Sequence, residues 1–267
     1  MIKTIFFDID GTLISFKTHR IPESTQIALR LLKKEGIRMF IATGRSASQI
    51  SHLGGFPFDG YITYNGSYCF TADDQVIFKS PVPTREIKRL TSYLNDNDHP
   101  FPCSFMTGEG TFINYVDHHV QHIAELVNVP LPVVRRLEDT TTEEIFQIGV
   151  YLGGQEEEVI MRTVLNNCVS NRWHPSFTDV NKAGNTKDAG IDRVISSYGI
   201  SLSEVMAFGD GGNDLKMLSH VPFGVAMGNA NEQVKSVANY VTESVDENGV
   251  WNALVHLNVL EGTKIGG

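Results

Sequence analysis

Hydrophobic and polar positions follow two different patterns along the chain. Residues 2–7 form a nearly continuous apolar run, as expected for a strand that is buried on both faces of a sheet. Pro22 then opens a segment with apolar residues at helical spacing, Gly36 closes it, and a second apolar strand is predicted at residues 38–42. Strand, helix and strand joined by short links predict parallel strands with right-handed crossovers.

The middle of the chain has a mixed pattern, in which short strand-like runs and amphipathic helices are interspersed. After Lys187 the first pattern returns, with a helix and then an apolar strand at residues 205–208. We therefore expect an α/β fold whose doubly wound, Rossmann-like parallel-sheet core is made by both chain ends and carries an inserted α+β domain. The predicted boundaries are 1–82 and 186–267 for the core and 83–185 for the insertion.

Composition narrows the class of protein. A length of 267 residues with 41% hydrophobic content is enough to bury a full core. The net charge of -9 argues against nucleic acid or an anionic membrane as a partner, and no apolar stretch approaches the ~20 residues of a membrane helix. The N-terminal apolar run is too short for a signal peptide, and the three cysteines are widely spaced. These features predict a cytoplasmic protein, and no obligate protein partner is evident.

Polar clusters follow three of the predicted core strands. Asp8 and Asp10 come after the first strand, Thr43 after the second, and the run 209–214 after the strand at 205–208. In an open parallel sheet, ligands bind beyond the carboxyl ends of the strands, so these clusters are expected to converge. Lys187 begins a helix and joins them if that helix runs beneath the same crevice.

The acidic residues of these clusters predict a cation site. Asp8, Asp10, Asp210 and Asp214 would crowd negative charge into one pocket, and two unit charges ~4 Å apart repel by about 4 kcal/mol at an effective dielectric of ~20. Such a pocket needs a cation or proton uptake. An all-oxygen set with few carboxylates favours Mg²⁺ that keeps several waters. Mg²⁺ beside a carboxylate, a threonine, a lysine and glycine-rich backbone is typical of phosphoryl transfer.

Other patterns predict less. His118, His119 and His122 have the helical spacing of a metal-binding pair, but no further ligand is evident, and an exposed helix face is the favoured interpretation. The chain has no GxxxxGK[ST] loop and no GxSxG elbow, so it lacks the signatures of a P-loop kinase and of an α/β-hydrolase.

The core clusters together resemble the four motifs of the haloacid dehalogenase (HAD) superfamily of phosphohydrolases. Residues 8–13 match its first motif, Thr43 the second, Lys187 the third and residues 209–214 the fourth. The position and size of the insertion are similar to the Cof-type subfamily with its type IIB cap, and residues 6–19 are similar to hexose-phosphate phosphatases. The resemblance spans both chain ends, while the insertion is only loosely diagnostic.

The resemblance implies a role for each matching residue. Asp8 would be the nucleophile that forms an aspartyl-phosphate, and Asp10 would protonate the leaving oxygen and then activate water. Mg²⁺ would be held by Asp8, the Asp10 main-chain carbonyl and Asp210, with Asp214 as a direct ligand or as indirect support. The residues expected to hold the phosphate are Thr43, Gly44, Lys187 and Asn213.

The resemblance also implies that the insertion is a cap that excludes water and selects the substrate. Arg45, Asn65 and a cap residue near Trp173 or His174 would touch the leaving group of a small phosphorylated metabolite, with hexose phosphates suggested by the resemblance. Core packing is the competing interpretation for Trp173.

Two alternative functions stay open. A phosphosugar mutase would share the aspartyl nucleophile and Mg²⁺ but would return the phosphate to the sugar, so release of inorganic phosphate separates it from a phosphatase. A non-catalytic phosphoacceptor module would also use an acidic pocket, a threonine and a lysine. The inserted domain argues against the module, and multiple turnovers would exclude it.

Overall fold

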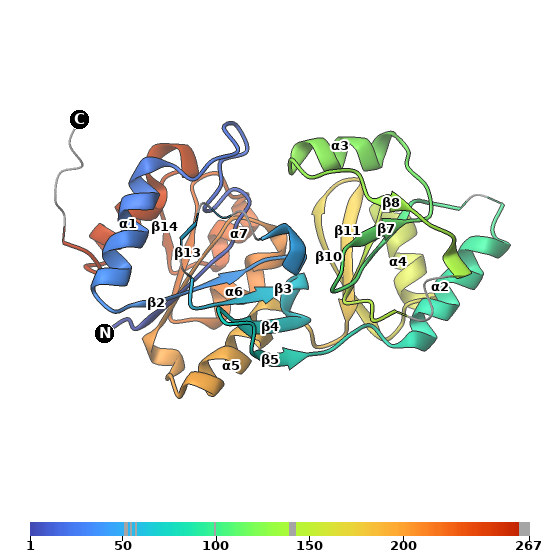
Figure 1. Cartoon of the computed structure of the whole chain (residues 1–267). Coiled ribbons are helices and arrows are strands. Elements are labelled where there is room, and N and C mark those ends of the chain that lie inside the picture. Colours follow the sequence, from blue (N-terminus) through green and yellow to red (C-terminus); the bar gives the residue numbers. More distant parts are fainter. Residues whose placement is uncertain (51–52, 54, 57, 99, 139–142, 262–267) are drawn as a thin grey trace. The chain divides into compact units, whose positions relative to one another are not determined.

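The chain divides into two compact units, which are drawn together in Figure 1. The computed structural model describes residues 1–50, 53, 55–56, 58–98, 100–138 and 143–261, so residues 262–267 of the predicted core lie outside the described residues. The first unit comprises Met1–Thr43, His52–Phe78 and Thr186–Gly267, and the second comprises Gly44–Ser51 and Lys79–Asn185. Both ends of the chain belong to the first unit, where the blue and red segments of Figure 1 meet.

The first unit is built on an eight-stranded sheet with the order β14-β13-β12-β1-β2-β3-β4-β5. The pairings from β14 to β3 are all parallel, and β4 pairs antiparallel with β3. The strands are β1 (Thr4–Phe7), β2 (Arg38–Ala42), β3 (Gly60–Thr63), β4 (Tyr68–Thr71), β5 (Val76–Lys79), β12 (Val205–Gly209), β13 (Phe223–Ala226) and β14 (Tyr240–Val241). This parallel core confirms the predicted α/β class.

Helices cover this sheet because its strands are apolar on both faces. The helices of the unit are α1 (Glu23–Lys34), α5 (Lys187–Tyr198), α6 (Leu215–His220), α7 (Glu232–Val237) and α8 (Gly249–His256). Phe6 and Phe40 share a hydrophobic cluster with apolar residues of α5, α6 and α7. Successive strand residues point to opposite faces, so Ile5 and Phe7, which are also fully buried, face the other side.

The second unit is built on a six-stranded sheet with the order β10-β11-β9-β6-β7-β8. The ladders are antiparallel except for the short parallel pairing of β7 with β8. The strands are β6 (Cys103–Met106), β7 (Thr111–Ile113), β8 (Val133–Val134), β9 (Gln147–Val150), β10 (Cys168–His174) and β11 (Phe177–Lys182). The mixture of antiparallel strands and helices confirms the predicted α+β character of the insertion.

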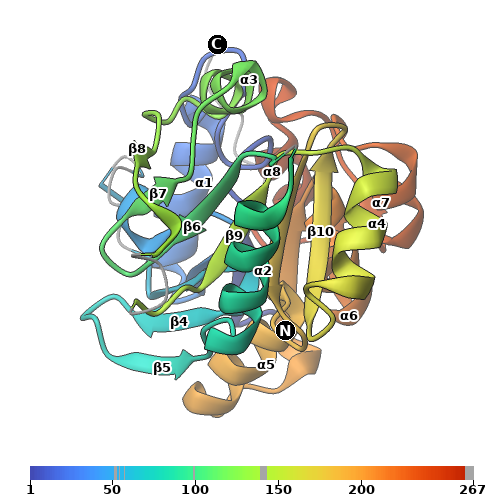
Figure 2. The ribbon, with the colours of Figure 1, turned by 90° about the vertical axis from the view of Figure 1, so that its right-hand side faces the viewer.

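Among the described residues of this unit, three helices cover the second sheet. They are α2 (Thr84–Asp96), α3 (His118–Leu126) and α4 (Gly154–Thr163). Helices α2 and α4 lie on one face, in front of the sheet in Figure 2, and share a cluster with Phe105 and Ile148. Helix α3 contributes Val120 and Ile123 to a separate cluster with Tyr151 and Phe177. No helix among the described residues is long and apolar enough to span a membrane.

Candidate active site

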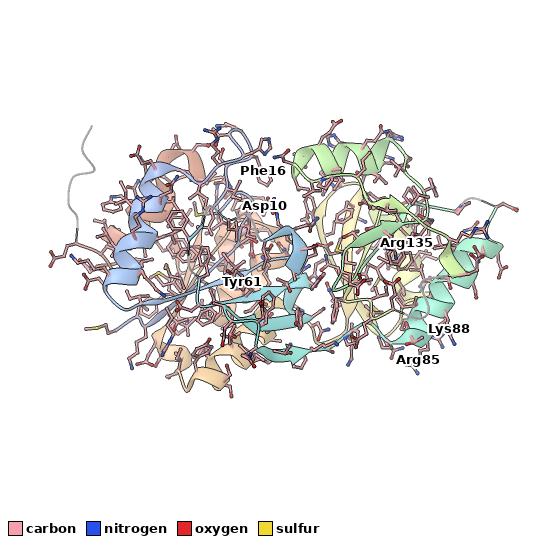
Figure 3. All side chains as sticks on the ribbon, in the orientation of Figure 1. Asp10, Phe16, Tyr61, Arg85, Lys88 and Arg135 are labelled. Carbon is pink, nitrogen blue, oxygen red and sulfur yellow. The ribbon has the colours of Figure 1, made fainter. Side chains whose placement is uncertain are left out.

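The first predicted cluster follows β1 directly. The backbone N–H of Asp8 donates to the Phe208 carbonyl at 3.0 Å, which holds the ends of β1 and β12 side by side. Asp8 is 6% exposed, and Asp10 lies in the same loop, where Figure 3 labels it. Gly11 has φ +83, and a Cβ there would lie 2.1 Å from Asp210 Oδ2. Only glycine therefore allows this loop to approach Asp210 so closely.

Lys187 reaches the cluster from the start of α5. Its Nζ donates to Asp8 Oδ1 and to Asp214 Oδ1, each at 2.6 Å, and the side chain is almost completely buried. Burial opposes the charge, but the carboxylates of Asp214 and Asp8 outweigh it and raise the pKa of Lys187. The lysine is therefore a fixed, protonated group between two acids that lie far apart in the sequence.

Asp214 is fully buried, and its two oxygens have different partners. Oδ1 accepts the bond from Lys187, while Oδ2 accepts the backbone N–H groups of Asp210 at 3.0 Å and Gly211 at 2.9 Å. These bonds close the turn after β12, which continues as a 3₁₀ turn (Gly212–Asp214) before α6 begins at Leu215. Asp214 thus fixes both the turn and the lysine.

Three carboxylates converge at this point. Asp8, Asp210 and Asp214 each offer one oxygen, and these atoms lie within 4.8 Å of one another. Burial raises the pKa of Asp8 to about 7; Lys187 opposes the rise, and Asp214 and Asp10 reinforce it. Burial and the charge of Asp8 also raise the pKa of Asp210 well above its ordinary value. One buried ammonium does not balance this charge, so the all-oxygen set fits a hard divalent cation.

Thr43 lies at the end of β2, which pairs in parallel with β1, so it shares the sheet edge with Asp8. Its carbonyl accepts the backbone N–H of Asn65 at 3.0 Å, and the Asn65 Oδ1 accepts a bond from Asn213 Nδ2 at 3.0 Å. Asn65 is 1% exposed and has φ +51, a conformation that asparagine tolerates better than most residues. The structure thus connects three predicted residues from three separate loops.

Two residues to which the sequence analysis gave no role contact Asp210. Asn229 Nδ2 donates to Asp210 Oδ2 and to the Gly11 carbonyl, both at 2.9 Å, while its Oδ1 accepts the Val245 N–H at 3.0 Å. Thr12 Oγ1 donates to Asp210 Oδ1 at 3.4 Å. Asn229 follows the apolar strand β13, so the same strand-end signal that identified the acidic clusters could have found it.

The remaining predicted residues, Gly44, Arg45 and Trp173, belong to the second unit. There the Gly44 carbonyl accepts a bond from Gln147 Nε2 at 2.9 Å, and Arg45 Nη2 donates to the Val127 carbonyl at the end of α3 at 3.1 Å. Trp173 Nε1 donates to Asp179 Oδ2 at 3.3 Å. These contacts anchor the three residues within their own unit, and their approach to the acidic cluster stays a prediction.

Comparisons with known proteins point to one family. A family model described as haloacid dehalogenase-like hydrolase matches residues 5–254. A Bacillus subtilis relative named "Putative phosphatase YkrA" is 36% identical over 262 residues, which cover 97% of this chain and 99% of the relative.

Two solved structures are also similar over 97% of the chain. One is BT1666 from Bacteroides thetaiotaomicron, described among phosphatases of the HAD superfamily, with 39% identity, a TM-score of 0.89 and 96% of that chain covered. The other is the HAD subclass IIB sugar phosphatase BT4131, with 39% identity, a TM-score of 0.88 and 100% of that chain covered.

Proposed function

The chain belongs to the haloacid dehalogenase-like hydrolases and is a phosphatase, and from this premise we propose that it uses Asp8 as its nucleophile and Mg²⁺ as its cofactor. The family acts on small phosphorylated molecules, and we propose sugar phosphates as the substrate class, since one similar structure is that of a sugar phosphatase. We also propose that it works in the cytoplasm.

One observation carries the nucleophile assignment: Asp8 and Lys187 form a buried ion pair at 2.6 Å beside a second acid, Asp210. A nucleophilic carboxylate must be ionised, and burial alone disfavours that state. Lys187 offsets part of this effect, and a bound divalent cation offsets more. The same positive charges screen the phosphate, so that an anionic nucleophile can approach it.

The metal assignment depends on the chemistry of the ligands. Asp8 and Asp210 offer carboxylate oxygens, and the Asp10 carbonyl is proposed as the third protein ligand. Both oxygens of Asp214 already accept hydrogen bonds, so we propose that Asp214 supports the site through Lys187 and the turn instead of binding the ion directly. Bound Mg²⁺ would polarise the phosphoryl oxygens and keep the remaining positions for water and substrate.

The proposed reaction has two steps. In the first, a carboxylate oxygen of Asp8 bonds to phosphorus, the ester P–O bond breaks, and Asp10 gives a proton to the leaving oxygen. In the second, Asp10 takes a proton from water, the water oxygen bonds to phosphorus, and the Asp8–phosphorus bond breaks to release inorganic phosphate. Thr43, Gly44, Lys187 and Asn213 are proposed to hold the phosphate oxygens through both steps.

We propose that residues 83–185 form the substrate-selecting cap, with Arg45 and Trp173 as residues that touch the leaving group. Asn65 is buried against Asn213, so its proposed role is to position that amide. In the cap, an indole bonded to the Asp179 carboxylate offers a fixed apolar face with a polar rim, which suits the mixed surface of a sugar.

The substrate proposal is tested with a panel of phosphorylated metabolites ranked by kcat/KM in the presence of Mg²⁺. Sugar phosphates at the top of the ranking would support it, and a clear preference for another class would overturn it. In the same assay, release of inorganic phosphate without an isomerised sugar phosphate distinguishes the phosphatase from a mutase.

A further inference from the structure

The second unit brings a carboxylate and several imidazoles together at the start of α3. The sequence alone showed His118, His119 and His122 without a further ligand. The structure adds Asp117, which immediately precedes α3 and caps it. Asp117, His118 and His119 each offer one ligand atom, and these atoms lie within 4.8 Å of one another. The missing oxygen ligand is thus the residue before the histidines.

Hydrogen bonding leaves these ligand atoms available. Asp117 Oδ1 accepts the backbone N–H groups of His119 at 2.9 Å and Val120 at 3.0 Å. Among the residues that the structure describes, none donates to Asp117 Oδ2, and none bonds to the ring nitrogens of His118 or His119. The capping bonds fix the carboxylate, while its second oxygen and both rings keep free lone pairs or exchangeable protons.

The two rings already lie close to one another and to solvent. The centroids of His118 and His119 are 3.9 Å apart with an interplanar angle of 39°. His118 is exposed, and Asp117 and His119 are half-buried, so an ion can reach them from water. Ligand atoms around a tetrahedral ion with bonds of about 2.0 Å lie about 3.3 Å apart, so atoms that now lie within 4.8 Å of one another would have to approach by at most about 1.5 Å.

We propose that Asp117, His118 and His119 bind a borderline divalent transition metal, with Zn²⁺ as the best match, at a site separate from the acidic cluster of the first unit. Two imidazoles and one carboxylate are the ligand set of several zinc sites and leave a fourth position for water. Imidazole nitrogen favours Zn²⁺, Ni²⁺ or Cu²⁺ over Mg²⁺, whereas the carboxylate cluster around Asp8 favours the harder ion.

Two further histidines of the second unit lie close to each other near these residues. His122 lies one helical turn after His118, and its ring centroid is 5.4 Å from that of His174 on β10. His174 is tied to its own strand, because the Ser176 N–H donates to its Nδ1 at 3.2 Å. Burial lowers the pKa of His174, and the neighbouring His122, Arg172 and His119 lower it further, which disfavours a positive charge on this ring. A positive helix N-terminus disfavours a cation, and the charge of Asp117 compensates for it.

The test uses the full-length chain without an affinity tag, stripped of metal and then saturated with Mg²⁺ to occupy the acidic cluster. Titration with Zn²⁺ is followed by calorimetry, and titration with Co²⁺ by its visible absorption. Wild type is expected to bind one further ion per chain. Asp117→Asn keeps a good N-cap but loses the charge, and His118→Ala loses one ring; each is expected to weaken Zn²⁺ binding at least ~10-fold.

The matched control is His256→Ala, which removes an exposed histidine from the first unit and is expected to leave the titration unchanged. Phosphatase activity of Asp117→Asn with Mg²⁺ checks that the fold is intact and is expected to match wild type. The proposal is overturned if wild type shows no saturable Zn²⁺ binding, or if Asp117→Asn and His118→Ala titrate as wild type does.

Discussion

The two units place their polar side chains differently. In the first, the polar clusters lie just beyond the ends of parallel strands, where Asp8, Thr43 and Asp210 share one edge of the sheet. In the second, several buried polar groups lie within antiparallel strands, as Gln147 and Asp179 do at 2.8 Å from each other. Parallel strands collect distant residues at one edge, and antiparallel strands have no such common edge. The residues of a functional site can therefore be predicted from the sequence in the first unit and much less so in the second.

The largest expected effect comes from removing the carboxylate of Asp8 at the strand ends of the parallel sheet. Asp8→Asn is expected to lower kcat by about 10⁴-fold or more, because an amide cannot act as the nucleophile. Steady-state phosphate release measures it, and circular dichroism checks the fold. Asp74→Asn is the matched control, since Asp74 is exposed and asparagine tolerates its φ of +61. Near-native turnover by Asp8→Asn would rule out the covalent mechanism.

Metal removal is expected to have the next largest effect. Chelation with EDTA should reduce activity about 10³-fold. Without the cation, the buried carboxylates keep their protons, and no metal charge screens the phosphate. Added Mg²⁺ should restore the rate. Activity that persists after thorough chelation would contradict the metal assignment, and recovery with Zn²⁺ but not Mg²⁺ would contradict the choice of ion.

Asn229 tests whether the residues after β13, like those after β1 and β12, contribute to the site at the strand ends. Asn229→Ala removes the amide that bridges Asp210 and the Gly11 carbonyl, so the Mg²⁺ concentration for half-maximal activity is expected to rise ~10-fold or more. Asn252→Ala removes an asparagine side chain elsewhere in the same unit and serves as the control. An unchanged Mg²⁺ requirement in Asn229→Ala would show that this bridge does not support the ion.

The second unit is expected to control which substrate reacts. Trp173→Ala should change the ratio of kcat/KM for two sugar phosphates by ~10-fold, while Asp10→Asn, in the first unit, should slow both substrates alike. The measurement is a pair of substrates assayed in parallel. If Trp173→Ala lowers both values by the same factor, the indole packs the unit and does not select substrates.

The smallest expected effect concerns stability and pH. The folded pKa of Asp8, at about 7, lies above its ordinary value of 3.8. At a pH between these two values, the metal-free native state keeps a proton on Asp8 that the unfolded chain has lost. Proton binding to Asp8 therefore stabilises the native state at low pH. This stabilisation is complete below pH ~4 and is lost as the pH rises through ~7. In EDTA, the Tm of wild type relative to Asp8→Asn should fall by about 3 °C from pH 5 to pH 8. A constant difference would contradict the raised pKa.

Much of the fold and the acidic cluster was predictable because each depends on local pattern. Apolar runs identified β1, β2 and β12, and the acids after them identified the converging residues. The two-residue strands β8 and β14 were missed, since two residues are too few to show a period.

The individual contacts were not predictable. The bond from Arg45 to the Val127 carbonyl joins residues far apart in the sequence, and nothing local specifies it. The same holds for Asp214, where one carboxylate oxygen accepts a bond from Lys187 and the other accepts backbone N–H groups of a turn. Asn229 was missed because an uncharged amide three residues after a strand is also a common loop residue. The Zn²⁺ ligand Asp117 was hidden because a residue before a helix is normally interpreted only as its cap.

The central claim is that the Asp8 carboxylate bonds to phosphorus during turnover, and trapping that bond tests it most directly. Asp10→Asn, which removes the group proposed to activate water, is mixed with a sugar phosphate and Mg²⁺ and quenched in acid. Peptide mass spectrometry then locates the phosphoryl group. The account predicts one phosphoryl group on Asp8 and none in an Asp8→Asn, Asp10→Asn double variant. Phosphate release from Asp10→Asn that proceeds with no phosphorylated peptide, or with the phosphoryl group on another residue, would contradict it.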